Sequence, residues 1–94
     1  MITVTFTYKR PDVNVPYWNI VIAEQIDKTK WYMDSGKINI SVNNVDELTQ
    51  IKTTTFVDQN TYDEYMNDPI IIAKLSARDE YHNANGITMT TQIS

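Results

Sequence analysis

The sequence predicts one α+β domain over residues 1–94, in which a four-stranded antiparallel sheet carries two helices on one face. Three observations predict this class. The chain has 94 residues, which suits one compact domain and is too short for two. Both ends of the chain alternate apolar and polar residues, as half-buried strands do. Between them, two segments with helical spacing flank a third alternating segment, which gives the order β-α-β-β-α-β.

The first strand is expected at the N-terminus. Apolar side chains fall on one of its faces and hydroxyl side chains on the other: Ile2, Val4, Phe6 and Tyr8 against Thr3, Thr5 and Thr7. β-Branched and aromatic residues at a period of two favour a strand with one buried face. Pro11 lacks the N–H that a sheet needs, so the strand ends before it, and Pro16 closes a short extended connection.

The first helix is expected from Pro16 to Asp34. Proline suits a first helical turn because its missing N–H has no partner there. Helical spacing places six large apolar residues on one broad arc: Trp18, Val21, Ile22, Ile26, Tyr32 and Met33. Ser35 and Gly36 supply the helix stop. A strand through residues 20–22 is the alternative, but the later spacing favours a helix.

A β-hairpin is expected over residues 37–57. Ile38, Ile40 and Val42 alternate with polar residues, and the Asn- and Asp-rich segment 43–46 favours a turn. The return strand is expected from Leu48 to Val57. Its inward face is undecided, because Ile51 and Val57 share one face while Leu48 and Phe56 share the other.

The second helical region is expected in two pieces. Asp58 or Asn60 can cap a short first piece, and Asp68 with Pro69 begins a second that runs to Ala84. One side of the second piece carries Ile70, Ala73, Ala77, Tyr81 and Ala84, and a neighbouring stripe carries Ile71, Leu75 and His82. Asn85 and Gly86 end the helix, and residues 87–93 form the last alternating strand.

Short connections and right-handed crossovers assemble this order into a ferredoxin-like sandwich. The hydroxyl and amide rows of the strands then lie on the sheet face away from the helices. That face offers little apolar area, so three possibilities stay open. A second copy packs there through a polar interface, or the protein dimerises elsewhere, or it stays monomeric.

The segment Thr61–Pro69, with the sequence TYDEYMNDP, precedes a helix that ends in YHNANGI. This pattern resembles the dimeric α+β barrel superfamily, and within it the antibiotic-biosynthesis-monooxygenase-like domains. The resemblance covers essentially the whole chain through the order of its elements. It implies a homodimer with facing sheets and a small-ligand pocket between sheet and helices. Members of the superfamily include cofactor-independent quinone-forming oxygenases and haem-degrading enzymes.

The haem-degrading branch uses an asparagine on the first strand, a tryptophan on the sheet and a histidine on the second helix. Only His82 matches this set, so we expect no haem chemistry and no cofactor. We expect no metal either. His82 is the one histidine, the chain has no cysteine, and Asp68 is better explained as a helix cap than as a ligand beside Asp63 and Glu64.

The resemblance places the candidate site between the helices and the sheet. There His82 is the candidate catalytic residue, because an imidazole with a pKa near 6.5 suits proton transfer. Arg78, Tyr81 and Trp18 are the candidate ligand-binding residues, with Arg78 stabilising a phenolate-like anion. Each has a plainer interpretation: His82 covers the core at a helix end, Arg78 pairs with a neighbouring acid, and Trp18 belongs to the core.

Ile20 and Trp31 are the candidate interface residues. Eleven positions apart, they fall on the same otherwise charged face of the first expected helix, and exposed aromatic residues are enriched at interfaces. The alternative is a helix that ends before Trp31, so that its ring folds under the turn at Gly36.

The charge and the N-terminal sequence limit the partners and the location that we expect for this protein. The net charge of −4 comes from residues 53–94, and Lys9-Arg10 is the one adjacent basic pair, so we expect neither a nucleic acid nor a membrane as a partner. The N-terminal residues show no secretory signal, which predicts a cytoplasmic protein. We expect a small homodimer that binds a small aromatic ligand or another protein. The alternative is a cofactor-independent monooxygenase-like enzyme with an aromatic or polyketide-like substrate.

Overall fold

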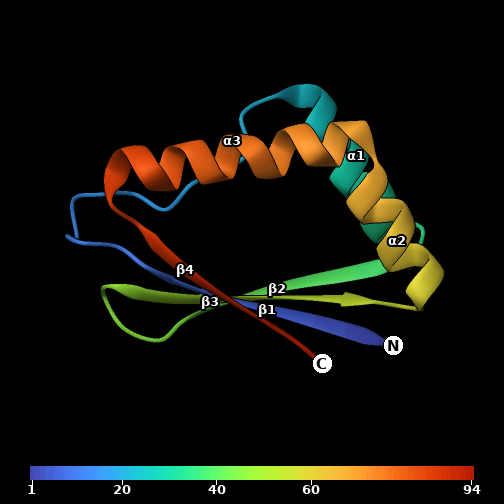
Figure 1. Cartoon of the computed structure of the whole chain (residues 1–94), viewed down its shortest axis with the longest axis horizontal. Coiled ribbons are helices and arrows are strands. Elements are labelled where there is room, and N and C mark those ends of the chain that lie inside the picture. The colour runs from blue at the N-terminus through green and yellow to red at the C-terminus, as the bar shows by residue number, and fades with distance from the viewer.

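The computed structural model describes residues 1–94 and confirms the predicted order of elements (Figure 1). The strands are β1 (Ile2–Lys9), β2 (Ile38–Asn44), β3 (Thr49–Phe56) and β4 (Thr88–Ile93). The helices are α1 (Ala23–Asp34), α2 (Gln59–Asn67) and α3 (Pro69–Asn85). All three helices lie on one side of the sheet, and no element covers the other side (Figure 1). None of them has the length and apolar character that crossing a membrane requires.

The sheet has the order β2-β3-β1-β4 with antiparallel neighbours throughout, so β1 and β3 are central. Val4 and Tyr8 of β1 are buried, which places the apolar row of this strand toward the helices as predicted. The register decides the open question on β3. Phe56 is buried beside Ile2, and residues two apart share a face, so Lys52 lies on the helix-facing side.

The opposite face of the sheet carries the predicted hydroxyl row. Thr3 pairs with Thr55 and Thr5 with Thr53 across β1 and β3. Thr7 pairs with Thr90 of β4. We call this surface the threonine face; it consists of Thr3, Thr5, Thr7, Ile51, Thr53, Thr55 and Thr90. β-Branched side chains favour the strand conformation here without creating a large apolar patch.

The apolar core occupies only one end of the space between sheet and helices. Its buried members are Val4, Tyr32, Ile38, Phe56, Tyr65 and Ile71. The rings of Tyr32 and Phe56 meet the ring of Tyr65 edge to face, with centroids 5.1 and 5.3 Å apart. Such pairs add about 0.5–1.5 kcal/mol each to the gain from burial. The C-terminal half of α3 extends beyond this core over the other end of the sheet (Figure 1).

The first helix begins later than the sequence predicts. Helix α1 starts at Ala23, and residues 11–22 form an irregular segment that we call the strap. The Tyr81 hydroxyl donates a 2.6 Å hydrogen bond to the Pro16 carbonyl, and the Arg10 guanidinium lies 4.8 Å from the centre of the Tyr17 ring. These contacts hold the strap across the domain, which a helix starting at Pro16 would not allow. Trp18 therefore lies on the strap and not on a helix.

The predicted apolar arc of the first helix is also wrong, except at Tyr32. Helix α1 buries Gln25, Thr29 and Tyr32, whereas Val21, Ile22, Ile26 and Met33 are exposed. Helix α3 buries the neighbouring stripe and not its alanine-rich side: its buried residues are Ile71, Lys74, Arg78 and His82. A prediction from periodicity counts only apolar residues as buried. Lysine and arginine also have long apolar stems, and on α3 these stems cover the sheet.

The predicted helix ends are confirmed. Asp58 accepts a 2.7 Å hydrogen bond from the Thr61 amide at the start of α2. Asp68 accepts one of 2.9 Å from the Ile70 amide at the start of α3. Gly86 ends α3 with a φ of +70°, a conformation that glycine adopts without steric cost.

We expect Asp68→Ala to lower the free energy of unfolding by about 2 kcal/mol. The carboxylate caps α3 and also accepts a 3.0 Å hydrogen bond from the hydroxyl of the buried Tyr32, and each role contributes about 1 kcal/mol. Urea denaturation measures the loss. Asp63→Ala is the control, because the exposed Asp63 accepts only a surface bond from Gln59. Equal losses in the two variants would contradict the double role of Asp68.

Candidate functional site

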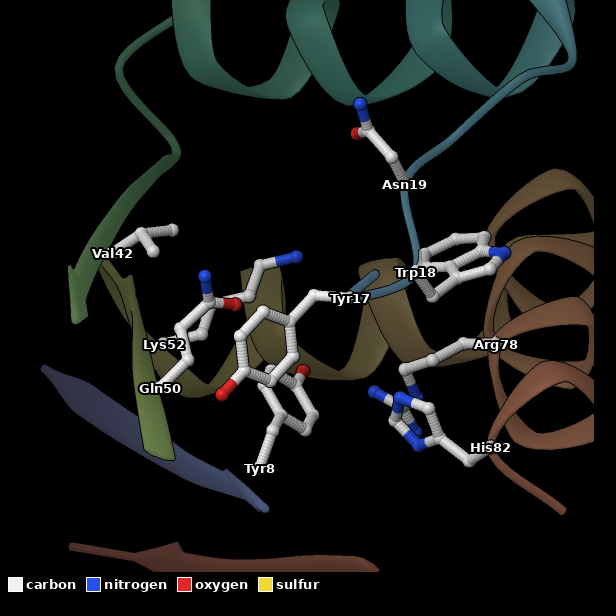
Figure 2. Close-up of a pocket in the computed structure, with 9 residues that line it drawn as sticks. All are labelled: Tyr8, Tyr17, Trp18, Asn19, Val42, Gln50, Lys52, Arg78 and His82. Atoms are coloured by element: carbon white, nitrogen blue, oxygen red, sulfur yellow. The ribbon is translucent and has the colours of Figure 1, made fainter. Parts of the chain in front are cut away.

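Two cavities lie between the sheet and helix α3. The strap cavity, of about 310 Å³, lies against the strap and is lined by residues that include Tyr8, Tyr17, Trp18 and His82 (Figure 2). The core cavity, of about 290 Å³, adjoins the apolar core and is lined by residues that include Phe6, Tyr65, Lys74 and Leu75. Lys52 and Arg78 line both cavities. Each volume is near the lower limit of about 300 Å³ for small-molecule sites.

Three cationic side chains line these cavities. Lys52 extends from β3, and Lys74 and Arg78 extend from successive turns of α3. Lys74 is 2% exposed and Arg78 is 8% exposed. No aspartate or glutamate lines either cavity. Since buried charges are normally paired, this set of cations is the most unusual electrostatic feature of the fold.

The Arg78 guanidinium is only partly satisfied within the chain. Its Nε and Nη2 atoms each donate to Oδ1 of Asp79 over 3.1 Å, and this carboxylate is largely exposed. The guanidinium also lies 5.0 Å from the centre of the Phe6 ring. A guanidinium has five N–H donors, so most of those on Arg78 are free for a ligand.

Lys74 has no acidic partner. Its Nζ donates hydrogen bonds to Thr29 Oγ1 over 3.0 Å and to the Tyr65 hydroxyl over 2.6 Å. Burial, reinforced by the charges of Lys52 and Arg78, lowers the pKa of Lys74 to about 7. Burial also raises the pKa of Tyr65 to about 12, so that its hydroxyl keeps its proton. Near neutral pH the site therefore holds an amine that exchanges between its neutral and charged forms.

His82 is buried on the last turns of α3, with its imidazole edge-on to the Tyr8 ring at a centroid distance of 5.2 Å. Burial, and then the nearby charge of Arg78, lower the pKa of His82 below its usual value. The imidazole is therefore neutral at pH 7 and can accept a proton. Figure 2 shows it beside Arg78 at the strap cavity.

The strap brings a further polar group to the site. The Tyr17 hydroxyl is buried and has no hydrogen-bond partner in the protein. Its ring lies in the strap cavity above Tyr8 (Figure 2). A buried hydroxyl without a partner costs about 1–3 kcal/mol, and a ligand with a polar group in the cavity would remove that cost.

The structure brings together three of the four residues that the sequence placed in the site. Trp18, Arg78 and His82 line the strap cavity. Tyr81 lines neither cavity, because its hydroxyl is bonded to the strap. Arg78 was expected either to bind a ligand or to pair with a neighbouring acid. It pairs with Asp79 and also lines both cavities. No group of three or more His, Asp or Glu side chains is placed to hold a metal ion.

The two candidate interface residues do not share a helix face. Ile20 lies on the strap before α1, whereas Trp31 lies within α1, which continues to Asp34. The alternative in which the helix ends before Trp31 is therefore also wrong. Trp31 is 47% exposed, and the ammonium groups of Lys28 and Lys37 lie 4.7 and 4.8 Å from the centre of its ring.

Sequence reasoning missed Lys52, Lys74, Tyr8 and Tyr17 as site residues. One signal was present in the chain. Lys74 and Arg78 are four positions apart on the stripe that also holds Ile71 and His82, so a helix that buries this stripe buries both cations. Lys52 gave no comparable signal, because the inward face of its strand was undecided.

We expect the free energy of unfolding to rise with pH from 7 to about 9.5, and Lys74→Met to flatten this rise. Over this range the folded protein has released the Lys74 proton, whereas the unfolded chain, with a lysine pKa of about 10.4, still holds it. Stability rises with pH wherever the unfolded state binds more protons, by at most about 1.4 kcal/mol per pH unit for one group.

Urea denaturation at several pH values measures this slope. Lys30→Met is the control, because Lys30 is exposed and pairs only with Asp34 on the surface. An unchanged slope in Lys74→Met would contradict the low pKa.

The comparisons with known proteins bear on the fold. No family model and no curated protein matches the sequence. Solved structures do match, and one of them is a Deinococcus radiodurans protein proposed to be an antibiotic biosynthesis monooxygenase. The match covers 100% of this chain and 90% of that one, with a TM-score of 0.52 and 8% sequence identity. At this identity the similarity shows the fold alone. The chain therefore has the ferredoxin-like fold of antibiotic-biosynthesis-monooxygenase-like domains, as the resemblance around Thr61–Pro69 predicted.

Proposed function

We propose that this domain binds a small anionic aromatic molecule between the sheet and α3, and that it acts as a homodimer. The observation that carries the ligand proposal is the set of three cations, Lys52, Lys74 and Arg78, at two cavities without a single carboxylate in their lining. The chain as a whole is acidic, with a net charge of −4, so this local excess of positive charge is not a general property of the sequence.

Electrostatics favours an anion at this position. Moving an unpaired charge out of water costs several kcal/mol, and an opposite charge within a low-dielectric site offsets that cost. Arg78 has free N–H donors that can bind a carboxylate or phenolate through two parallel hydrogen bonds. Lys52, which lines the same two cavities, adds a second positive charge to the site.

The lining of the cavities favours an aromatic ligand. Tyr8, Tyr17 and Trp18 contribute rings to the strap cavity, and Phe6 and Tyr65 contribute rings to the core cavity. Aromatic rings pack against one another in offset or edge-to-face geometry, as the rings of this core already do. The volumes, near 300 Å³ each, suit a compact molecule with few rings.

A second candidate function is cofactor-independent oxidation of a phenolic substrate. The neutral imidazole of His82 beside Arg78 favours it, because His82 can take the phenol proton while Arg78 stabilises the phenolate. The electron-rich ring then reduces dioxygen, with one oxygen atom retained as a ring carbonyl and the other released as water. Consumption of dioxygen by the protein with a hydroxylated aromatic substrate distinguishes this function from binding alone.

The homodimer is proposed through the threonine face. No helix covers this face of the sheet, so it is open to a second copy (Figure 1). Threonine methyl groups supply some apolar area at about 25 cal/mol per Å², and their hydroxyls can bond across the interface. The resemblance to a superfamily of facing sheets supports the same arrangement.

We expect wild-type protein to bind benzoate at least tenfold more tightly than its uncharged counterpart benzyl alcohol. Arg78→Gln should weaken benzoate binding at least tenfold, about 1.4 kcal/mol, and leave benzyl alcohol binding unchanged. Titration calorimetry at low ionic strength measures both. Lys30→Met is the control, because it removes an exposed positive charge that lines neither cavity. Equal affinities for the two compounds would contradict an anion site.

We expect sedimentation equilibrium to show a dimer that Thr5→Lys converts to a monomer. Thr5 pairs with Thr53 and with Gln92 at the middle of the sheet, so the substitution places two like charges at the centre of a symmetric interface. Val45→Lys, in the turn between β2 and β3, is the control for added charge. Even a weak dimer is populated at a protein concentration of about 100 μM. A wild-type protein that is monomeric at this concentration would contradict the homodimer.

A further inference from the structure

The terminal nitrogen of Lys74 is held in one position inside the protein. Its Nζ is fixed by two hydrogen bonds, to Thr29 Oγ1 over 3.0 Å and to the Tyr65 hydroxyl over 2.6 Å. A neutral amine has two N–H groups and one lone pair. When both N–H groups bond to these two oxygens, the lone pair occupies the remaining direction and is free to attack a carbon atom.

The surroundings keep this amine reactive. Lys74 is 2% exposed and makes no ion pair, and both Lys52 and Arg78 add positive charge nearby. Desolvation next to other cations is the arrangement that activates lysines for imine formation with carbonyl compounds. The lowered pKa of Lys74, about 7, follows from the same causes and means that much of the amine is neutral at physiological pH.

We infer that Lys74 is a nucleophilic lysine that forms an imine with a small carboxylated aldehyde or ketone in the core cavity. The inference rests on the proposed function, since Arg78 and Lys52 would hold the carboxylate of this ligand. Lys74 and Arg78 lie one helical turn apart on α3, with their Cβ atoms about 6 Å from each other. Both residues line the core cavity, so a small molecule with a carbonyl group at one end and a carboxylate at the other can reach both of them there.

The reaction is a condensation and needs no oxidant. The Lys74 nitrogen adds to the carbonyl carbon and gives a carbinolamine, in which the former carbonyl oxygen is a hydroxyl group. That hydroxyl takes a proton and leaves as water, while the C–N bond becomes C=N. The nitrogen gives up a proton in the same reaction, and the Tyr65 hydroxyl, 2.6 Å from Nζ, is placed to relay protons between nitrogen and oxygen while it ends with its own proton in place.

The test uses 4-carboxybenzaldehyde with sodium cyanoborohydride at pH 7, which reduces an imine to a stable secondary amine. Peptide mapping by mass spectrometry then measures the labelling rate of every lysine. We expect Lys74 to be labelled at least tenfold faster than the exposed Lys9 and Lys30. Labelling of the surface lysines at the same rate as Lys74, or no labelling of Lys74, would overturn the inference.

Variants separate the parts of the argument. Lys74→Arg keeps the charge and should lose the fast label, with circular dichroism and the thermal midpoint verifying the fold. Tyr65→Phe should slow the labelling at least tenfold. Arg78→Gln should slow labelling by 4-carboxybenzaldehyde but not by the uncharged 4-methylbenzaldehyde. If wild-type Lys74 reacts equally fast with both aldehydes, the assignment of a carboxylated ligand is wrong.

Benzoate binding, measured alongside Lys74 labelling, distinguishes a failure of this inference from a failure of the proposed function. If benzoate binds and Lys74 stays unlabelled, the nucleophilic role fails and the anion site stands. If benzoate does not bind and Lys74 is unlabelled, both fail. Fast labelling of Lys74 that benzoate suppresses in proportion to its occupancy supports both, because the two molecules then compete for the same cations.

Discussion

The burial of cations by α3 is the constraint on which the rest of this structure depends. The helix buries Lys74 and Arg78 on its sheet-facing side, beside Ile71 and His82. Arg78 lines both cavities and Lys74 lines the core cavity, so the buried positive charge and the open space lie together. Burial, reinforced by the neighbouring positive charge of Arg78, lowers the pKa values of Lys74 and His82 and so prepares the site for chemistry. The aromatic core fills one end of the space between sheet and helices, and the candidate site begins at its edge and continues to the other end.

Sequence reasoning predicted the elements of this fold well, because local chemistry determines them. The alternation of Val4 and Thr5 along β1, the caps at Asp58 and Asp68, and the left-handed Gly86 each act over a few residues. Their effects do not depend on how distant parts of the chain pack. The element order follows from them, and the ferredoxin-like arrangement follows from the order.

The start and the inward face of α1 could not be predicted in the same way. The strap stays irregular because Pro16 bonds to Tyr81, a residue 65 positions away, and no local pattern reports such a contact. The inward face of β3 depended on its register with β1, which the residues of β3 alone do not reveal. Lys74 was overlooked because a burial pattern read from hydropathy assigns every lysine to solvent, whereas here Thr29 and Tyr65 receive its hydrogen bonds.

In the homodimer that we propose, the threonine face has a consequence for how the two copies associate. Each protomer completes its own core between sheet and helices, so a pair joined through Thr5 and its neighbours separates without unfolding either member. Hydroxyl groups released from such a contact return to water at little cost. Subunits of this kind exchange readily, and a mixed population of two variants equilibrates into hybrids.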